Sequence, residues 1–96
     1  MSVSLPNLQN IAIAIHPKIP QAAARAGEIE AYLKEQGIET VLGMLYDEEL
    51  TRQIKSGQFD LMIALGGDGT MLRAGHLCGP SKLPILGINL GRFGFL

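Results

Sequence analysis

Residues 66–70 read GGDGT, so that a single carboxylate, Asp68, stands among three glycines directly after an apolar segment. Gly66 and Gly67 can adopt positive φ angles, and their lack of a side chain lets a ligand approach the backbone closely. Thr70 is placed to cap a following helix, and the free amide groups and positive dipole end of a helix favour an anion. The segment therefore predicts a phosphate-binding turn.

The aspartate of this turn restricts the chemistry further. A carboxylate repels a phosphate, so a site that only binds an anion gains nothing from Asp68. Two uses fit: the carboxylate accepts a proton from an attacking hydroxyl, or it helps to hold the Mg²⁺ that neutralises the phosphates. Both uses belong to phosphoryl transfer. The alternative is a purely architectural turn, because Asp and Gly are common turn residues.

Two better-known phosphate motifs do not fit residues 66–73. No lysine follows the glycines, which excludes a P-loop. Gly67 and Gly69 have the G-x-G spacing of a dinucleotide-binding turn, but Leu72 stands where that fingerprint needs its third glycine. The segment thus predicts a phosphate turn of another kind.

A second glycine-rich segment, residues 87–95, reads GINLGRFGF and follows a later apolar run. Its glycines allow a loop to fold beside the first turn. Asn89 offers hydrogen-bonding groups there, and Phe95 offers an apolar surface on which a base could stack. The alternative is that Phe93 and Phe95 continue into the core.

Four further residues are weaker candidates. Arg73 lies one turn into the helix expected after GGDGT and could reach a bound phosphate, or it is an ordinary exposed arginine. His16 ends the first apolar segment at the edge where ligands bind, but a loop histidine is often satisfied by backbone groups. His76 and Cys78 are expected to be packing residues rather than ligands.

The elements that position these residues alternate along the chain. Buried strands alternating with amphipathic helices predict an α/β fold, with a parallel sheet of about four strands in the order 2-1-3-4 and helices on both faces. Ligands bind at the carboxyl ends of such strands, where both glycine segments lie. Asp47 is expected to be the N-cap of the second helix. The expected strands are residues 10–17, 38–42, 59–65 and 83–90, and the expected helices are residues 21–37, 48–57 and 70–79.

Composition narrows the class of protein. A length of 96 residues, 47% of them hydrophobic and 18% charged, indicates one globular domain. A net charge of -1 argues against a nucleic-acid or membrane-surface partner. The one cysteine, Cys78, excludes an internal disulfide, and no Cys/His spacing suggests a metal site. Since we find neither a signal peptide nor an apolar run of about 18 residues, we expect a soluble cytoplasmic protein.

The two glycine segments together resemble the N-terminal domain of NAD kinases, the enzymes that phosphorylate NAD to NADP. The resemblance rests on LGGDGTMLRA followed by LPILGINLGRFGFL. The opening IAIAIHPKIPQAAARAGEIEAYLKEQGIE is also similar to that family's first strand, loop and helix, so nearly the whole chain is covered. GGDGT alone is shared with phosphofructokinases and diacylglycerol-type lipid kinases, and the second segment makes the resemblance specific.

The resemblance implies roles for several residues. Asp68 would accept the proton of the 2′-hydroxyl on the adenosine ribose of NAD, and Gly69 would contact the dinucleotide beside it. Leu72 and Phe95 would line the adenosine pocket, and Arg73 would lie near the bound nucleotide. The implied reaction transfers a phosphoryl group from ATP or inorganic polyphosphate with the assistance of Mg²⁺.

The resemblance also implies that more chain is needed for activity. NAD kinases continue into a β-rich C-terminal domain that supplies much of the NAD site and the oligomer interface. We therefore expect residues 1–96 to be the N-terminal domain alone, catalytically inactive by itself, and the complete protein to be a homo-oligomer. Two alternatives stay open: another GGDGT kinase that acts on a lipid or a sugar phosphate, or a non-catalytic nucleotide-binding module.

Overall fold

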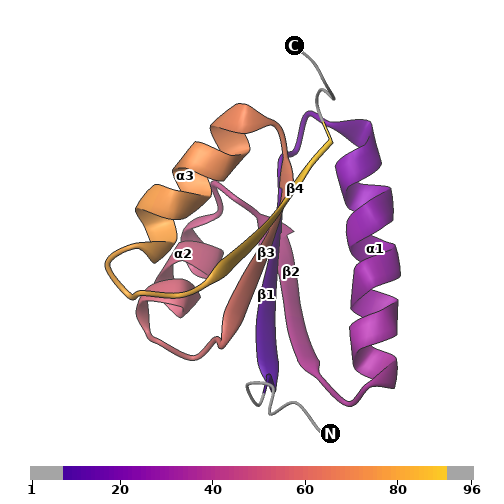
Figure 1. Cartoon of the computed structure of the whole chain (residues 1–96), viewed down its shortest axis with the longest axis vertical. Helices are drawn as coiled ribbons and strands as arrows, with labels where there is room; N and C mark the ends of the chain where they lie inside the picture. Colours follow the sequence, from indigo (N-terminus) through magenta and orange to yellow (C-terminus); the bar gives the residue numbers. More distant parts are fainter. Residues whose placement is uncertain (1–7, 91–96) are drawn as a thin grey trace, which may run out of the picture.

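The computed structural model describes residues 8–90, which alternate between strand and helix along the chain (Figure 1). This order confirms the predicted alternation. None of the helices within these residues combines the length and the hydrophobicity needed to span a bilayer. The elements are β1 (Asn10–Ile15), α1 (Pro20–Glu35), β2 (Glu39–Met44), α2 (Glu48–Lys55), β3 (Leu61–Gly66), α3 (Asp68–Cys78) and β4 (Ile85–Asn89).

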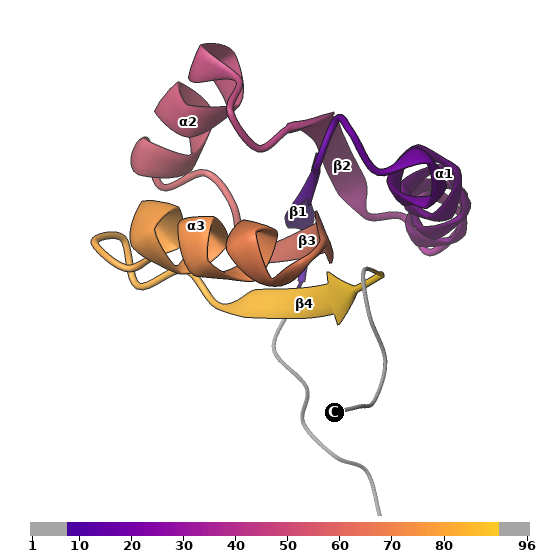
Figure 2. The same ribbon diagram turned by 90° about the horizontal axis from the view of Figure 1, so that it is seen from above.

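The strands form one sheet, all parallel, in the order β2-β1-β3-β4. Strand order and direction both confirm the predicted α/β architecture. Figure 2 shows α1 on one face of the sheet and α2 with α3 on the other. Because all strands run in one direction, their last residues meet at the same edge of the sheet, which we call the carboxyl edge. These last residues are Ile15, Met44, Gly66 and Asn89.

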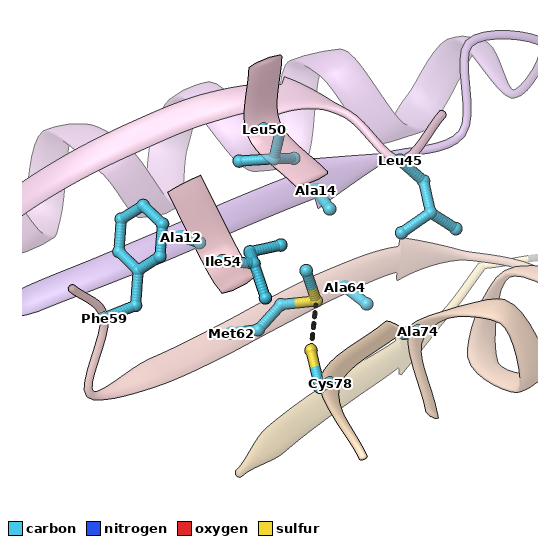
Figure 3. Close-up of a cluster of buried hydrophobic side chains, with 10 residues drawn as sticks. All are labelled: Ala12, Ala14, Leu45, Leu50, Ile54, Phe59, Met62, Ala64, Ala74 and Cys78. Atoms are coloured by element: carbon cyan, nitrogen blue, oxygen red, sulfur yellow. Dashed lines mark hydrogen bonds between the residues drawn. The ribbon is translucent and has the colours of Figure 1, made fainter. Parts of the chain in front are cut away.

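The core forms two layers because β1 lies inside the sheet and is buried on both faces. Ile11 and Ile13 pack toward α1, whereas Ala12 and Ala14 pack toward α2 and α3. Side chains on successive residues of a strand point to opposite faces, so one strand serves both layers. Figure 3 draws the layer toward α2 and α3, which consists of Ala12, Ala14, Leu45, Leu50, Ile54, Phe59, Met62, Ala64, Ala74 and Cys78.

Cys78 ends α3 inside this layer, where its Sγ lies 3.5 Å from the Sδ of Met62 (Figure 3). Full burial raises the pKa of the Cys78 thiol, because a thiolate would lose its hydration there. Cys78 is therefore a packing residue, as predicted.

The helix starts test the capping predictions. Asp47 is the N-cap of α2, and its Oδ2 accepts a hydrogen bond from the Leu50 N–H at 3.2 Å, which confirms the prediction. α3 begins at Asp68, so its N-cap is Gly67 and not Thr70, although the Thr70 side chain does take part in capping the helix, as predicted. Thr70 lies inside the first turn instead, where its hydroxyl accepts a hydrogen bond from the Gly67 N–H at 3.3 Å.

Gly66 is needed for close packing rather than for an unusual φ angle. The glycines with positive φ among residues 8–90 are Gly37 and Gly57, so Gly66 and Gly67 do not use the positive φ that glycine allows. A Cβ on Gly66 would lie 2.6 Å from the Cβ of Thr70, which is fully buried. The absent side chain at Gly66 therefore lets α3 start directly over the end of β3.

Asp60 links two strands at the edge of the sheet opposite the carboxyl edge. Its Oδ2 accepts hydrogen bonds from the backbone N–H groups of Gln9 and Asn10, each at 2.9 Å. These two bonds lower the pKa of the Asp60 carboxyl, because they favour its charged form. The carboxylate thereby ties the start of β1 to the start of β3.

Replacing Gly66 by alanine tests the close contact with Thr70. We expect Gly66→Ala to lower the free energy of unfolding by about 1–3 kcal/mol, the usual cost of forcing an extra methyl group into a packed site. Denaturant unfolding followed by circular dichroism measures the change. Gly67→Ala is the matched control, since no atom of residues 8–90 beyond its chain neighbours lies within 4 Å of the added methyl group, and its cost should stay below about 1 kcal/mol. Equal losses in the two variants would contradict the packing argument.

Replacing Asp60 by asparagine tests the carboxylate clamp through its pH dependence. A carboxyl whose pKa is lower in the folded state stabilises the fold above its unfolded pKa, near the ordinary value of 3.8. This contribution disappears as the pH falls through the folded pKa. We therefore expect Asp60→Asn to be less stable than the wild type at pH 7, and the difference to shrink below pH 3.8.

Unfolding curves of both proteins at a series of pH values measure this difference. Glu35→Gln, which removes an exposed carboxylate from α1, is the control for the loss of one surface charge. A stability difference between Asp60→Asn and the wild type that does not change with pH contradicts the clamp.

Candidate functional site

The pairing of β3 with β4 brings the two glycine segments together at the carboxyl edge. Gly66 and Asn89 are partners in the register, and the Leu90 N–H donates to the carbonyl oxygen of Gly66 at 2.7 Å. The Nδ2 of Asn89 donates a hydrogen bond to the Oδ1 of Asp68 at 2.7 Å. The expectation that the second segment lies beside the first turn is therefore confirmed for its described part, up to Leu90.

Asp68 occupies the first position of α3 with an exposed side chain. A carboxylate is favoured there because the positive end of the helix dipole stabilises its charge. The hydrogen bond from Asn89 uses one acceptor position, and an ionised carboxylate has about four. Asp68 therefore keeps the capacity to accept a hydrogen bond from a ligand hydroxyl.

The backbone around Asp68 is open to a ligand. Apart from the local backbone, no atom of residues 8–90 lies within 4 Å of the position that a Cβ would take on Gly67 or on Gly69. The Met71 N–H makes a helical bond to the carbonyl oxygen of Gly67 at 3.1 Å, and the amide groups before it precede the helical ladder. This combination of open backbone and amide groups that have no partner within the helical ladder fits a phosphate group.

Gly66 and Thr70 form the buried side of this turn. Both are buried, and the Thr70 hydroxyl is turned inward to the Gly67 N–H. The structure therefore places them in the frame of the turn, whereas Gly67, Asp68 and Gly69 form its accessible surface.

Leu72 and Arg73 lie on the exposed face of α3. Leu72 is 65% exposed, the largest exposure among the large hydrophobic residues of the described chain. Both residues line an open groove of about 870 Å³ between α2 and α3, together with Gly69 and His76. The groove reaches the first turn of α3 at Gly69, and Asp68 is not among its lining residues.

Tyr46 is a site residue that the sequence reasoning missed. It follows β2 at the carboxyl edge, and the centre of its ring lies 4.5 Å from the Cζ of Arg73, a cation–π distance. The ring of His16 lies edge-on to Tyr46, with centroids 6.2 Å apart. The sequence offered only an aromatic residue between the predicted strand 38–42 and the predicted helix 48–57.

The structure places the two histidines, His16 and His76, in different surroundings. The His16 Nδ1 accepts a hydrogen bond from the Lys18 N–H at 3.0 Å, so this histidine is satisfied by the backbone, as one of the two interpretations held. His76 is exposed on the wall of the groove, so the expectation that it is a packing residue is wrong. Phe95 lies outside the described residues.

A metal ion would find few protein ligands in this part of the chain. Within residues 8–90, no group of three or more His, Cys, Asp and Glu side chains is arranged to hold one. Mg²⁺ commonly binds through one or two carboxylates, and waters and substrate phosphates complete its shell. As an exposed carboxylate beside an open phosphate turn, Asp68 fits the part of one such ligand.

Comparison with proteins of known sequence identifies the family of this chain. The NAD kinases of Chloroflexus aurantiacus and Treponema denticola are 35% and 36% identical to this chain over 89 and 93 residues. The NAD kinase of Methanothermobacter thermautotrophicus is 32% identical over 95 residues. Each alignment covers 93% of this chain, but 32%, 31% and 34% of the respective relative. The chain therefore spans about a third of the length of the curated relatives it matches.

The family model described as the ATP-NAD kinase N-terminal domain matches residues 40–96, which is more than half of the chain. The matched part contains both glycine segments and the strands β3 and β4 that bring them together. The chain belongs to the ATP-NAD kinase N-terminal domain family.

Proposed function

We propose that this chain is the N-terminal part of an enzyme that transfers a phosphoryl group to the 2′-hydroxyl of NAD and forms NADP. The phosphoryl donor is ATP or inorganic polyphosphate. Family membership and relatives named NAD kinase support the proposal. Because the chain spans about a third of those relatives, the activity is proposed for the whole protein. The observation that carries the proposal is the Asp68–Asn89 pair beside the open first turn of α3.

Asp68 acts as the proton acceptor in this proposal. The 2′-hydroxyl oxygen of NAD attacks the terminal phosphorus of the donor, and its proton passes to the Asp68 carboxylate. The bond from that phosphorus to the leaving oxygen breaks, and ADP or a shortened polyphosphate departs. Asn89 holds the carboxylate in place through its hydrogen bond, so that the acceptor is oriented before the hydroxyl arrives.

The phosphates bind at the first turn of α3. The open backbone of Gly67 and Gly69 presents amide groups to them, and Arg73 supplies a positive charge on the same side of the helix as Gly69. Mg²⁺ bound with the donor would neutralise phosphate charge, with Asp68 as one possible ligand from this chain.

The adenosine of NAD is placed against Leu72 and Phe95. The high exposure of Leu72 supports this placement. A base bound in the groove would cover its apolar surface, and removing that surface from water is favourable. These residues provide one wall of a pocket, so we propose that residues 1–96 alone do not turn over and that the complete protein is a homo-oligomer. The buried free thiol of Cys78 is compatible with the reducing conditions of the cytoplasm, where we place the protein.

The role of Asp68 is tested by replacing it with asparagine in the gene product at its full length. Loss of the proton acceptor should lower kcat by about 10²–10⁴-fold, because general-base assistance is worth that much. A coupled assay of NADP formation at pH 7 measures it, with a lipid and a sugar phosphate as competing acceptors. Asp60→Asn is the matched control, since it removes a carboxylate that precedes β3 at the opposite edge of the sheet, and it should keep wild-type kcat. Wild-type turnover in Asp68→Asn would show that another group takes the proton.

The role of Asn89 is tested by a double-mutant cycle with Asp68. Asn89→Ala should lower kcat by about tenfold, because a hydrogen bond to a charged group is worth roughly 1.5 kcal/mol or more. If Asn89 acts by orienting the carboxylate, the same substitution in the Asp68→Asn background should have little further effect. Fully multiplicative losses in the cycle would mean that Asn89 acts independently of Asp68.

A further inference from the structure

We propose that Tyr46 is a positioning residue, whose ring holds the guanidinium of Arg73 beside the first turn of α3 and thereby raises the affinity for the phosphates of the donor. This inference rests on the proposed function, since it concerns the same phosphate turn. Tyr46 follows β2 at the carboxyl edge and belongs to neither glycine segment.

The contact joins two separate elements of the fold. Tyr46 lies between the end of β2 and the start of α2, and Arg73 lies in the second turn of α3. The Cζ of Arg73 lies 4.5 Å from the centre of the Tyr46 ring, well within the 6 Å or so over which a cation is attracted to an aromatic face. The ring therefore fixes the end of a side chain that is otherwise exposed.

The fixed guanidinium lies on the side of the phosphate turn. Long side chains on a helix lean over the preceding turn, and Arg73 stands four residues after Gly69 on the same helical face. Gly69 leaves open space there, and both residues line the same groove. The positive charge of Arg73 is thus held next to the amide groups that are proposed to bind phosphate.

The contact with Tyr46 does not use up the hydrogen-bond donors of Arg73. A guanidinium carries five N–H donors, and one ring face 4.5 Å from its Cζ cannot satisfy all of them. Within residues 8–90, no carboxylate makes an ion pair with Arg73. A phosphate can therefore use these donors without first displacing an acidic side chain.

Tyr46 is itself held in place, although its side chain is 49% exposed and so not fixed by burial. The backbone on its two sides is bonded, from the Leu45 N–H to Ile15 and from the Asp47 N–H to Met44, each at 3.0 Å. The His16 ring contacts Tyr46 edge-on, with an interplanar angle of 85°. An exposed aromatic ring held in this way is suited to pre-ordering a flexible partner, which lowers the entropy lost on binding.

The test compares Tyr46→Leu, which removes the ring, with Tyr46→Phe, which keeps it. In the gene product at full length, with NAD saturating, Tyr46→Leu should raise KM for the donor about 2–5-fold, the range that corresponds to a cation–π contact at an exposed site. The kcat should stay near the wild-type value, and Tyr46→Phe should restore KM. Tyr32→Leu, at the chain's other tyrosine on the exposed side of α1, is the matched control and should leave KM unchanged.

A cycle with Arg73→Met shows whether Tyr46 acts through Arg73. Tyr46→Leu should have no further effect on KM in that background. The proposal is overturned if Tyr46→Leu leaves KM unchanged, if Tyr46→Phe loses as much as Tyr46→Leu, or if the effect persists without Arg73. Thermal unfolding of each variant by circular dichroism separates these outcomes from a general loss of stability.

A second measurement does not depend on turnover. In the NMR spectrum, the ring current of Tyr46 should shift the Nε–H proton of Arg73 upfield in the wild type and in Tyr46→Phe, and the shift should vanish in Tyr46→Leu. Inorganic tripolyphosphate should bind the wild type 2–5-fold more tightly than Tyr46→Leu, by roughly the same contact energy.

The two measurements distinguish the failure of each proposal. If the wild type binds tripolyphosphate but forms no NADP, the proposed function fails and the role of Tyr46 is still decided by the difference in binding. If NADP forms but the upfield shift is missing or tripolyphosphate binds both proteins equally, the role of Tyr46 is overturned and the proposed function stands.

Discussion

The parallel pairing of β3 with β4 is the interaction on which the site depends. It sets Asn89 opposite Gly66, and the bond from the Leu90 N–H to the Gly66 carbonyl continues the pairing past the last residue of β4. The side chain of Asn89 then meets Asp68 at 2.7 Å. A slip of one residue would turn Asn89 to the other face of the sheet, because side chains alternate along a strand. The register, and not the strand order alone, therefore creates the pair.

The tight exit from β3 is the second constraint. One residue, Gly67, separates the end of the strand from the start of α3, so the first turn of the helix folds back over Gly66. Thr70 then occupies the space that a side chain on Gly66 would need. The glycines of the turn consequently serve different ends: Gly66 permits packing, while Gly67 and Gly69 leave the surface open. The short connection is what sets the first amides of α3 at the end of the strand.

Much of this arrangement follows from local sequence patterns. Alternating apolar and amphipathic segments predicted the strand order, and Asp47 could be identified as a cap because capping depends on a few neighbouring residues. The contact between Tyr46 and Arg73 could not be predicted, because it joins segments that approach only in the folded chain. The hydrogen bonds of Asp60 could not be predicted for a similar reason. Its partners are the backbone N–H groups of Gln9 and Asn10, about 50 residues earlier, and any residue type other than proline provides such a group. The sequence also does not show why residue 66 is a glycine. A glycine can serve either a positive φ or close packing, and Gly66 serves close packing.

Two opposite charges on α3 are held by different parts of the sheet. Asp68 and Arg73 stand five residues apart, which is not a spacing at which helical side chains pair, and among residues 8–90 they make no ion pair with each other. Here Asp68 is held by Asn89 at the end of β4, whereas Arg73 is held by Tyr46 after β2. These strands are the two outer strands of the sheet, with β1 and β3 between them. The carboxylate and the guanidinium of α3 are therefore held by contacts on different sides of the helix. In the proposed reaction, this separation leaves the carboxylate free to accept a proton while the guanidinium meets the phosphates.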